Sequence, residues 1–572
     1  MNSSSKINAQ EVNMIEKNIE RTVRELSEKI GCRAPGSWKE LEAAEYFKKQ
    51  LAEFGIESII ESFPSASHIA EKSSITVSGK IFDSTPAQFS AAGKVSGKLV
   101  FLGYENNRKI SSEVKLSGRI GLLMPSGSSS IPEKIDYLLE LEAQGLEGLI
   151  VVSPGLDTIQ PKAVRYPEIK TMPIAAVSWR SGSELAGLEG QDVELEIAHS
   201  GKARSESVNL VLKFPGKTKK WMTVSAHMDS AAGSPGALDN AGGSAMLLEL
   251  TKKFKGSDLQ NSVYFVFTGS EEYGMLDMCG AGSEAFYRSR EDDIENCVVH
   301  IEIDDIGNRL GMPDVQWAGS GKFLKTIKEA ADGASYKFTR KNQPSCDHGA
   351  AVKRGIPYLW LTDALFERPI YHTPEDKIGF IDFSKAASYY PFLVSEIESL
   401  ASLEAFYLHV KEGDITIRPA HFSDIPALFE INKEAFGPVS MNRMEEDFFK
   451  EKLGGRNWYD YKGEDVAYQC KNNIYLVIVC EIEKRVVGYA TAYYDMPRGI
   501  AAIGNNAVHP DFQGRGIGKA LQKEIARRMD EEGFTKLKVS TLSVDIPAQK
   551  IYEKLGYVRY SENINYLKKV EK

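Results

Sequence analysis

The sequence predicts an α/β protein with a mainly parallel sheet, a small β-rich inserted module and a separate α/β domain. Three observations predict this fold class. In residues 208–410, apolar strand-like runs alternate with stretches of helical periodicity, as in strands joined by crossover helices that cover both faces of a parallel sheet. In residues 67–207, short apolar runs are bounded by glycine, serine and proline, which is typical of a strand-rich module. After the polar break "KEGD", residues 411–572 begin with a new strand and helix, which indicates another domain.

Composition limits the classes of function. With 572 residues, 42% of them hydrophobic and 26% charged, the chain is long enough for about three or four globular domains. No apolar run approaches the roughly 18 residues of a membrane span, and a net charge of −9 without a long basic run argues against nucleic acid as a partner. The opening "MNSSSKINAQEVN" lacks the apolar core of a signal peptide, so we expect a cytoplasmic protein. Six scattered cysteines without a CxxC pair predict neither a disulfide framework nor a thiolate zinc site.

Helices open the chain, in residues 1–66. Apolar residues recur every three or four positions from 12 to 30, and Gly31 follows as a stop signal, so we expect an amphipathic helix there. Ser37 and Glu40 have the spacing of a capping box before a second helical stripe.

The two following regions differ in their helical content. Residues 67–207 contain short strands and one helical stretch, residues 133–145, and carry little that looks catalytic. Residues 208–410 form the alternating α/β region, and residues 383–406 are expected to make its final helix.

Polar side chains follow one apolar strand after another in this α/β region. His227 and Asp229 are two residues apart at a strand's end, so both point to one side, as a metal ligand and its orienting carboxylate do. The alternative for an isolated His-x-Asp is a half-buried histidine beside a solvated aspartate. Further carboxylates and a second histidine converge on the same rim, and such nitrogen and oxygen donors suit catalytic zinc, with manganese or cobalt as alternatives. These further residues are Asp239, Glu271, Glu272, Asp304, Asp305 and His372.

Five segments resemble, in the same order, the ligand-bearing motifs of the two-zinc aminopeptidase and glutamate carboxypeptidase family. They read "SAHMDS", "GALDNAGG", "TGSEEYG", "HIEIDDIG" and "YHTPEDKIG". The segment "GCRAPGS" resembles the family's N-terminal segment, and residues 67–207 resemble the protease-associated domain inserted in many members. The resemblance covers roughly residues 10–405 and implies an α/β/α sandwich that hydrolyses peptide bonds.

The resemblance also implies a role for each matching residue. Glu271 would be the general base, and Asp229 would orient His227. The implied zinc ligands are Asp239 as the bridge, His227 and Asp304 for one ion, and Glu272 and His372 for the other. Glu302 and Asp305 flank Asp304 where the family has uncharged residues, so the choice of carboxylate stays open. Asp347 and His348 match a segment beside the family's substrate pocket, and the alternative is a capping aspartate with a surface histidine.

The last domain, residues 411–572, contains "VHPDFQGRGIGKALQKEIARRM" between a predicted strand and helix. Glycines at such a helix start let backbone N–H groups approach an anion. This stretch, with "ITIRPAHFSDIPAL" and "DIPAQKIYEKLGYVRY", resembles GNAT-type N-acetyltransferases over about residues 415–567. The resemblance implies that Val508 contacts the acetyl carbonyl and that Tyr552 is the general acid, although the tyrosine has packing as its alternative role. The implied acetyl-CoA pyrophosphate loop is Gln513, Gly514, Arg515, Gly516, Ile517 and Gly518.

Two departures concern the transferase chemistry. Asp545 stands where many members have asparagine, and "GIAAIGNNAV" lacks the carboxylate that often serves as a base. Deprotonation of the amine would then need water or Asp495.

These observations predict a zinc aminopeptidase fused to an acetyl-CoA-dependent N-acetyltransferase, with a peptide substrate and an amine acceptor as partners. A carboxypeptidase or amino-acyl cyclase on the same metal core is the first alternative, and a carboxypeptidase would need a cation such as Arg368 or Lys353. An acetyltransferase with a non-catalytic peptide-binding peptidase fold, or a metal-free receptor, are further alternatives. Because both domains share one chain, an amine released by the peptidase domain could be acetylated by the acetyltransferase domain. Side-chain preference and oligomeric state are open.

Overall fold

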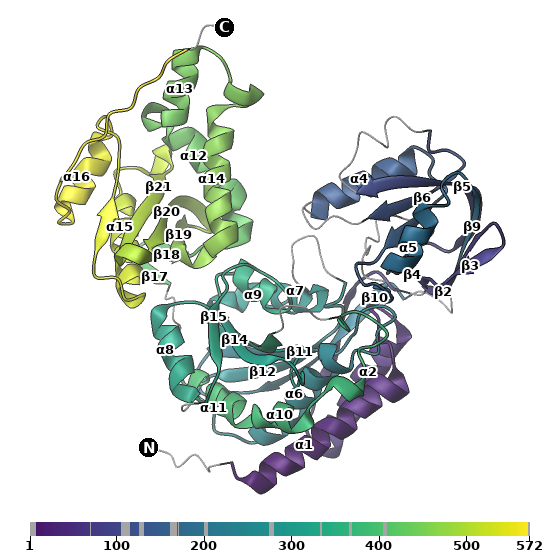
Figure 1. Ribbon diagram of the computed structural model, residues 1–572. Coiled ribbons are helices and arrows are strands. Elements are labelled where there is room, and N and C mark those ends of the chain that lie inside the picture. The colour runs from purple at the N-terminus through teal and green to yellow at the C-terminus, as the bar shows by residue number, and fades with distance from the viewer. Residues whose placement is uncertain are drawn as a thin grey trace.

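Three β-sheets organise the chain (Figure 1). The computed structural model describes residues 7–68, 70–104, 115–124, 131–160, 169, 171–199, 204–273, 280–331, 334–364, 369–403 and 409–569. Within this part of the chain, no helix has the length and apolar character needed to cross a membrane.

The central sheet has eight strands in the order β1-β10-β12-β11-β13-β16-β14-β15. Its middle strands β12, β11, β13 and β16 are mutually parallel, as expected, whereas β10 and β14 run antiparallel to them. At the two ends of the sheet, β1 pairs antiparallel with β10 and β15 pairs parallel with β14. The carboxyl ends of the parallel strands therefore meet at one edge. The strands are β1 Ile59–Pro64, β10 Glu206–Phe214, β11 Trp221–His227, β12 Ser262–Thr268, β13 Cys297–Ile303, β14 Met312–Ala318, β15 Lys337–Arg340 and β16 Tyr358–Ala364.

Helices cover both faces of this sheet, with α1, α6, α10 and α11 on one side and α7 and α9 on the other (Figure 1). The final helix expected over 383–406 is divided at Tyr389, because Pro391 cannot continue the hydrogen-bond ladder of a preceding helix. Residues 404–406 of that expected helix lie outside the described residues. The helices are α1 Ala9–Arg24 with its π-helical extension Glu25–Ile30, α2 Trp38–Glu53, α6 Gly242–Phe254, α7 Ala281–Arg288, α8 Gly321–Ala330, α9 His348–Lys353, α10 Phe383–Ser388 and α11 Tyr390–Leu400.

A second sheet forms the inserted module, in the order β3-β2-β9-β5-β6-β7-β8-β4. It has its own apolar clusters on both faces. The chain leaves the central sheet at β1 and returns at β10, its antiparallel neighbour, so the module is inserted at one point. Its elements are β2 Ala70–Val77, β3 Lys80–Phe82, β4 Thr85–Pro86, β5 Gly93–Tyr104, β6 Arg119–Met124, α4 Ile131–Ala143, β7 Gly148–Val152, β8 Ile174–Val177, α5 Trp179–Ala186 and β9 Asp192–His199.

The third sheet runs β17-β18-β19-β20-β21-β22 and is antiparallel except for the pair β21 and β22. Figure 1 shows α12, α13 and α14 on one side of it and α15 and α16 on the other. The elements are β17 Val410–Glu412, β18 Ile415–Pro419, α12 Ile425–Ala435, α13 Met441–Phe449, α14 Trp458–Asn473, β19 Val477–Ile482, β20 Arg485–Asp495, β21 Ile500–Val508, α15 Ile517–Glu531, β22 Leu537–Val539 and α16 Ile546–Lys554.

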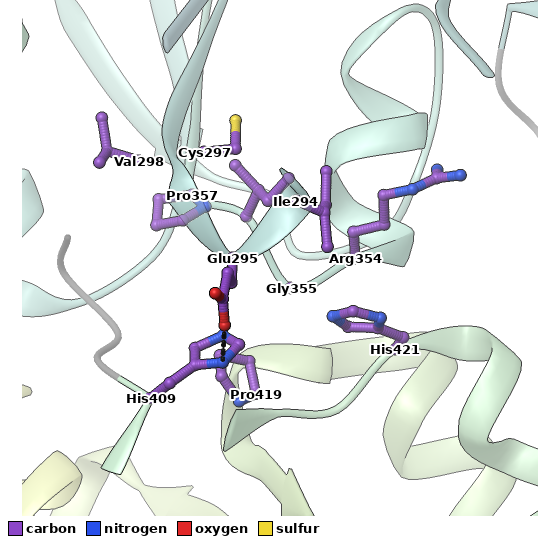
Figure 2. A pocket seen from close by; sticks show the side chains of 11 residues that line it. Ile294, Glu295, Cys297, Val298, Arg354, Gly355, Pro357, His409, Pro419 and His421 are labelled. Carbon is purple, nitrogen blue, oxygen red and sulfur yellow. Dashed lines mark ion pairs between the residues drawn. The ribbon is translucent and has the colours of Figure 1, made fainter. Parts of the chain in front are cut away.

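The third sheet's domain packs directly on the central one. The Tyr475 hydroxyl donates to the Ile356 carbonyl at 2.9 Å, and Arg340 pairs with Glu532 at 3.3 Å. One apolar cluster includes residues of both domains. At the boundary, His409 faces Glu295 across a small pocket that His421 also lines (Figure 2).

Candidate functional site

The predicted ligands gather where the parallel strands of the central sheet end. His227 is the last residue of β11, Glu272 lies four residues beyond β12, and Asp304 directly follows β13. Asp239 comes from the turn Ala237–Ala241 that leads into α6, and His372 follows β16. Parallel strands thus explain why residues up to 145 positions apart meet at one edge.

These side chains form two groups of donors that share Asp239. The His227 Nε2 atom lies 3.1 Å from Asp239 Oδ1 and 3.4 Å from Asp304 Oδ1. The His372 Nε2 atom lies 3.2 Å from Asp239 Oδ2 and 3.2 Å from Glu272 Oε1. In each group the donor atoms lie within 4.8 Å of one another, as around one metal ion.

Asp229 connects the first histidine with the glutamate pair. Its Oδ1 atom lies 3.5 Å from His227 Nδ1 and accepts the Glu271 N–H at 3.1 Å, while its Oδ2 atom accepts the Glu272 N–H at 3.0 Å. The carboxylate is fully buried. One side chain therefore sets the positions of the histidine and of both glutamates.

The chemistry of the donors fits a pair of divalent cations. Both ring nitrogens of His227, Asp239 Oδ2 and Asp304 Oδ1 are buried and lie close to one another or to neighbouring donors, but none of them makes a hydrogen bond of good geometry. Burying such atoms unpaired is costly, and so is crowding carboxylates, unless a cation compensates. Ser270, Asp305, Cys346 and His372 have positive φ angles around this edge, a backbone strain that clusters at functional sites.

The geometry favours Asp304 over its neighbours as the carboxylate of the first group. Glu302 is already occupied by the loop before α9, since it accepts the His348 N–H at 2.9 Å and bonds the His348 ring at 2.5 Å. Cys346 lies near Glu302 and Asp304, but burial and the surrounding carboxylates raise the pKa of its thiol well above its usual value. A protonated thiol is a poor metal ligand.

Asp347 and His348 are neither a capping aspartate nor a surface histidine. Both are fully buried, and Asp347 makes no side-chain cap bond although it stands at the start of α9. His348 stacks on Tyr358 with ring centroids 4.0 Å apart. Burial, followed by the charge of Glu271, raises the pKa of Asp347 to about 8, so the Asp347 carboxyl interacts electrostatically with the side chains of the site.

Three further buried residues support the site, and the sequence did not single out this role. Arg33 donates to five carbonyls, three of them in residues 228–236. Asp376 accepts the N–H groups of Leu238 and Asp239, which fixes the backbone at Asp239. Glu40 starts α2 with Ser37 as its cap, but its carboxylate crosses to the Ser270 N–H at 2.8 Å instead of completing a capping box at Ser37.

The glycine-rich loop lies at the start of α15. Gly514 and Gly516 have φ angles of 79° and 85°, and a Cβ atom at either would meet nothing within 4 Å, so open space faces the loop. Gly518 lies close to α16, because a Cβ there would be 3.3 Å from the end of the Ile551 side chain. These features are typical of a backbone anion cradle. Around it, Gln513 donates to the Val508 carbonyl at 3.0 Å, Arg515 lies 3.8 Å from Asp414, and Ile517 is buried.

Tyr552 reaches the neighbouring strand edge from α16. Its hydroxyl accepts from Asn506 at 3.2 Å, and burial raises its pKa above 10. Asp545, at the asparagine position of the family pattern, caps α16 by accepting the Ala548 N–H at 3.2 Å. Asp495 lies at the far end of β20, paired with Arg498 and Lys538 at 3.3 and 3.7 Å, so it is not placed to act as the base.

Comparison with known proteins finds a matching family for each of the two expected domains. The model of peptidase family M28 matches residues 209–391, and that of the GNAT acetyltransferase family matches residues 428–557. Aminopeptidase YwaD of Bacillus subtilis is 24% identical over 385 residues, covering 63% of this chain and 79% of that protein. A protein named "Probable leucine aminopeptidase" from Arthroderma benhamiae is 29% identical over 205 residues, or 33% of this chain. The match spans 56% of that relative's own length.

Solved structures share the fold of the peptidase part. The zinc aminopeptidase BSAP of Bacillus subtilis superposes with a TM-score of 0.57 at 20% identity, over 68% of this chain and 95% of that one. An aminopeptidase from Aneurinibacillus sp. strain AM-1 superposes with a TM-score of 0.56 at 20% identity, over 69% of this chain and 96% of that one. The chain thus joins a peptidase family M28 domain to a C-terminal GNAT-family acetyltransferase domain.

Proposed function

We propose that the central domain is a two-zinc aminopeptidase. The observation that carries this proposal is the pair of donor groups sharing Asp239, at the edge where four parallel strands end. His227 and Asp304 would hold one ion and Glu272 and His372 the other. Bound there, two zinc ions would supply a water of lowered pKa and a Lewis acid for the scissile carbonyl.

Glu271 is the residue proposed to move the proton. Its backbone N–H is fixed by Asp229, next to the proposed ligand Glu272, while the Glu271 carboxylate belongs to neither donor group. Glu271 would accept a proton from the attacking water and give it to the departing amine. Asp229 holds both glutamates and the His227 ring in the positions that this step requires.

Asp347 favours an aminopeptidase over a carboxypeptidase. Its Oδ1 atom is buried without a hydrogen-bond partner, and Asp347 and Glu271 both approach Gly280. A substrate ammonium beside Asp347 would favour the ionised form of this carboxyl and pair with it. A carboxypeptidase would need a cation for the substrate carboxylate. The candidate Lys353 instead acts on Glu284, whose pKa it lowers together with Arg354. The other candidate, Arg368, lies outside the described residues.

The test is hydrolysis of an unblocked peptide and its N-acetylated twin by the zinc-loaded chain and by Glu271→Ala. We expect release of the first amino acid from the unblocked peptide alone, and a loss of about a hundredfold or more in kcat for Glu271→Ala. Release from the carboxyl end of both peptides would show a carboxypeptidase instead. Zinc content measured on each sample separates a lost base from a lost metal.

The second proposed activity is N-acetyl transfer from acetyl-CoA. The loop of residues 513–518 would hold the pyrophosphate on its backbone N–H groups, and Tyr552 would protonate the departing thiolate. Thiol release in the presence of amines tests this activity, and Tyr552→Phe should lower kcat without weakening acetyl-CoA binding. The domain limits, the protease-associated identity of the inserted module and the cytoplasmic location stay predictions.

A further inference from the structure

The acetyltransferase domain contains a half-buried lysine, Lys462, that makes no ion pair among the residues the structure describes. Lys462 projects from α14 and donates from Nζ to Asn505 Oδ1 on β21 at 2.5 Å. Its ammonium also lies 4.6 Å from the centre of the Phe436 ring. The side chain is half-buried, and burial lowers its pKa below the ordinary value.

Lys462 makes no ion pair among the described residues, and Asp465, three positions further along α14, acts on its charge only at longer range. Asn505 is neutral, and in the part of the chain that the structure describes no carboxylate lies within the 4.0 Å of an ion pair with Lys462. Most half-buried cations of this domain are paired, as Arg418 is with Asp424 and Glu481. A partly desolvated ammonium with only an amide partner is suited to receive an anion from outside.

A second unsatisfied group lies two helical turns further along α14. The Gln469 Oε1 atom is buried without a hydrogen-bond partner, and its Nε2 atom lies 3.5 Å from the Cβ position of Gly504, the residue before Asn505. An acceptor oxygen of this kind suits an N–H group. The helix therefore presents a cation and a free acceptor to adjacent residues of β21.

The same stretch of β21 is open at its edge. The strand pairs with β22 only over residues 501–503, and residues 504–508 have no partner on that side among the described residues. Asn505 contacts Lys462, while Asn506 donates to the Tyr552 hydroxyl. Asn505 thus contacts a side chain from α14 and Asn506 a side chain from α16, and Figure 1 shows these two helices on opposite sides of the sheet.

We propose that the acetyl acceptor is an amine that carries a carboxylate, of the amino-acid class, and that Lys462 binds the carboxylate. The proposal rests on the acetyltransferase activity proposed above. The amine nitrogen forms a C–N bond to the acetyl carbon, the C–S bond breaks, and Tyr552 protonates the sulfur. The proton lost by the nitrogen returns to Tyr552 through water, so one amide and one thiol are produced. Free amino acids are also what the proposed aminopeptidase releases.

The experiment compares amino acids with their amino alcohols, which lack the carboxylate and have no bond for the peptidase to cleave. Thiol release and acetylated product are measured for the full chain with alanine, leucine and phenylalanine and with alaninol, leucinol and phenylalaninol. We expect kcat/KM to favour the amino acids, and Lys462→Met to lower it for them by about tenfold or more while the amino alcohols change little. Lys462→Arg should retain most of the preference.

Two controls separate this proposal from the function it rests on. Lys471→Met, an exposed lysine on the same helix, should change neither series, and acetyl-CoA binding should be unaltered in Lys462→Met. Equal use of both series by the wild-type chain, or an equal loss in both for Lys462→Met, would overturn the proposal while acetyl transfer stands. No transfer to any of the six amines would overturn the acetyltransferase function as well.

Discussion

At the scale of single residues, Asp229 shows how one carboxylate can position a whole constellation. It faces His227 and accepts the backbone N–H groups of Glu271 and Glu272, which are more than 40 residues away in the sequence. The His-x-Asp spacing predicted the contact with the histidine. It did not predict the contact with the glutamates, because that contact depends on how β11 and β12 lie side by side.

Asp229→Asn tests this positioning role. The amide keeps the shape but places an N–H group against one of the N–H donors that the carboxylate now accepts, so the glutamates and His227 should shift. We expect zinc affinity to fall by about ten- to a hundredfold, measured by competition with a chelator. Asp314→Asn, at another buried aspartate on β14, should leave zinc affinity unchanged. Equal affinities in both variants would contradict the role.

At the scale of elements, periodicity and stop signals predicted the elements that are long and regular. The first helix ends at Gly31, with a φ of 80°, as its sequence indicated. The strand β14 was missed because only the four residues "DVQW" of "MPDVQWA" alternate in polarity and a proline precedes them. Pro391 was passed over in the predicted final helix. Arg33 and Glu40 could not be recognised as supports of the site, since their partners lie about 200 residues away.

The start of α15 gives a prediction at this scale. Gly516→Ala places a Cβ in the proposed anion cradle and strains a φ of 85° by about 1 to 2 kcal/mol, so acetyl-CoA affinity should fall. Gly533→Ala, just beyond the other end of the helix, has a φ of 90° and equally open surroundings. It should cost similar stability without weakening acetyl-CoA binding, as calorimetry on both variants would show. Similar acetyl-CoA affinities would refute the cradle.

At the scale of the whole molecule, the two predicted domains share one apolar cluster. The sequence predicted the break between them but not the extent of their contact, because the residues involved look like ordinary core in each domain. Tyr475, for example, is buried and bonds the Ile356 carbonyl of the other domain. Contacts at the boundary between the two domains therefore contribute to the free energy of unfolding of the entire chain.

The histidines at this boundary predict a pH dependence. Burial, followed by the charge of Arg418, lowers the pKa of His421 to about 3, and burial lowers the pKa of His409 to about 4 (Figure 2). An unfolded chain has an imidazole pKa of about 6.5, so below that pH it binds more protons than the folded chain, and the free energy of unfolding falls as pH falls. Above about pH 6.5 this contribution is constant.

His421→Asn should therefore reduce the loss of stability between pH 7 and pH 5 by about 1 to 2 kcal/mol, because the amide keeps a cap acceptor for the Asp424 N–H and does not titrate. Urea unfolding at both pH values measures the difference. The same substitution at exposed His199 serves as the control. An unchanged pH slope in His421→Asn would disprove the boundary's contribution.

The central claim is that five residues hold two metal ions through a shared aspartate, and zinc stoichiometry tests it most directly. Protein saturated with zinc and dialysed should contain two ions per chain, His372→Ala should retain about one, and Asp239→Ala should lose affinity at both sites, with the fold checked by circular dichroism. A wild-type stoichiometry of one or none, or an Asp239→Ala variant that still binds both ions tightly, would contradict the account.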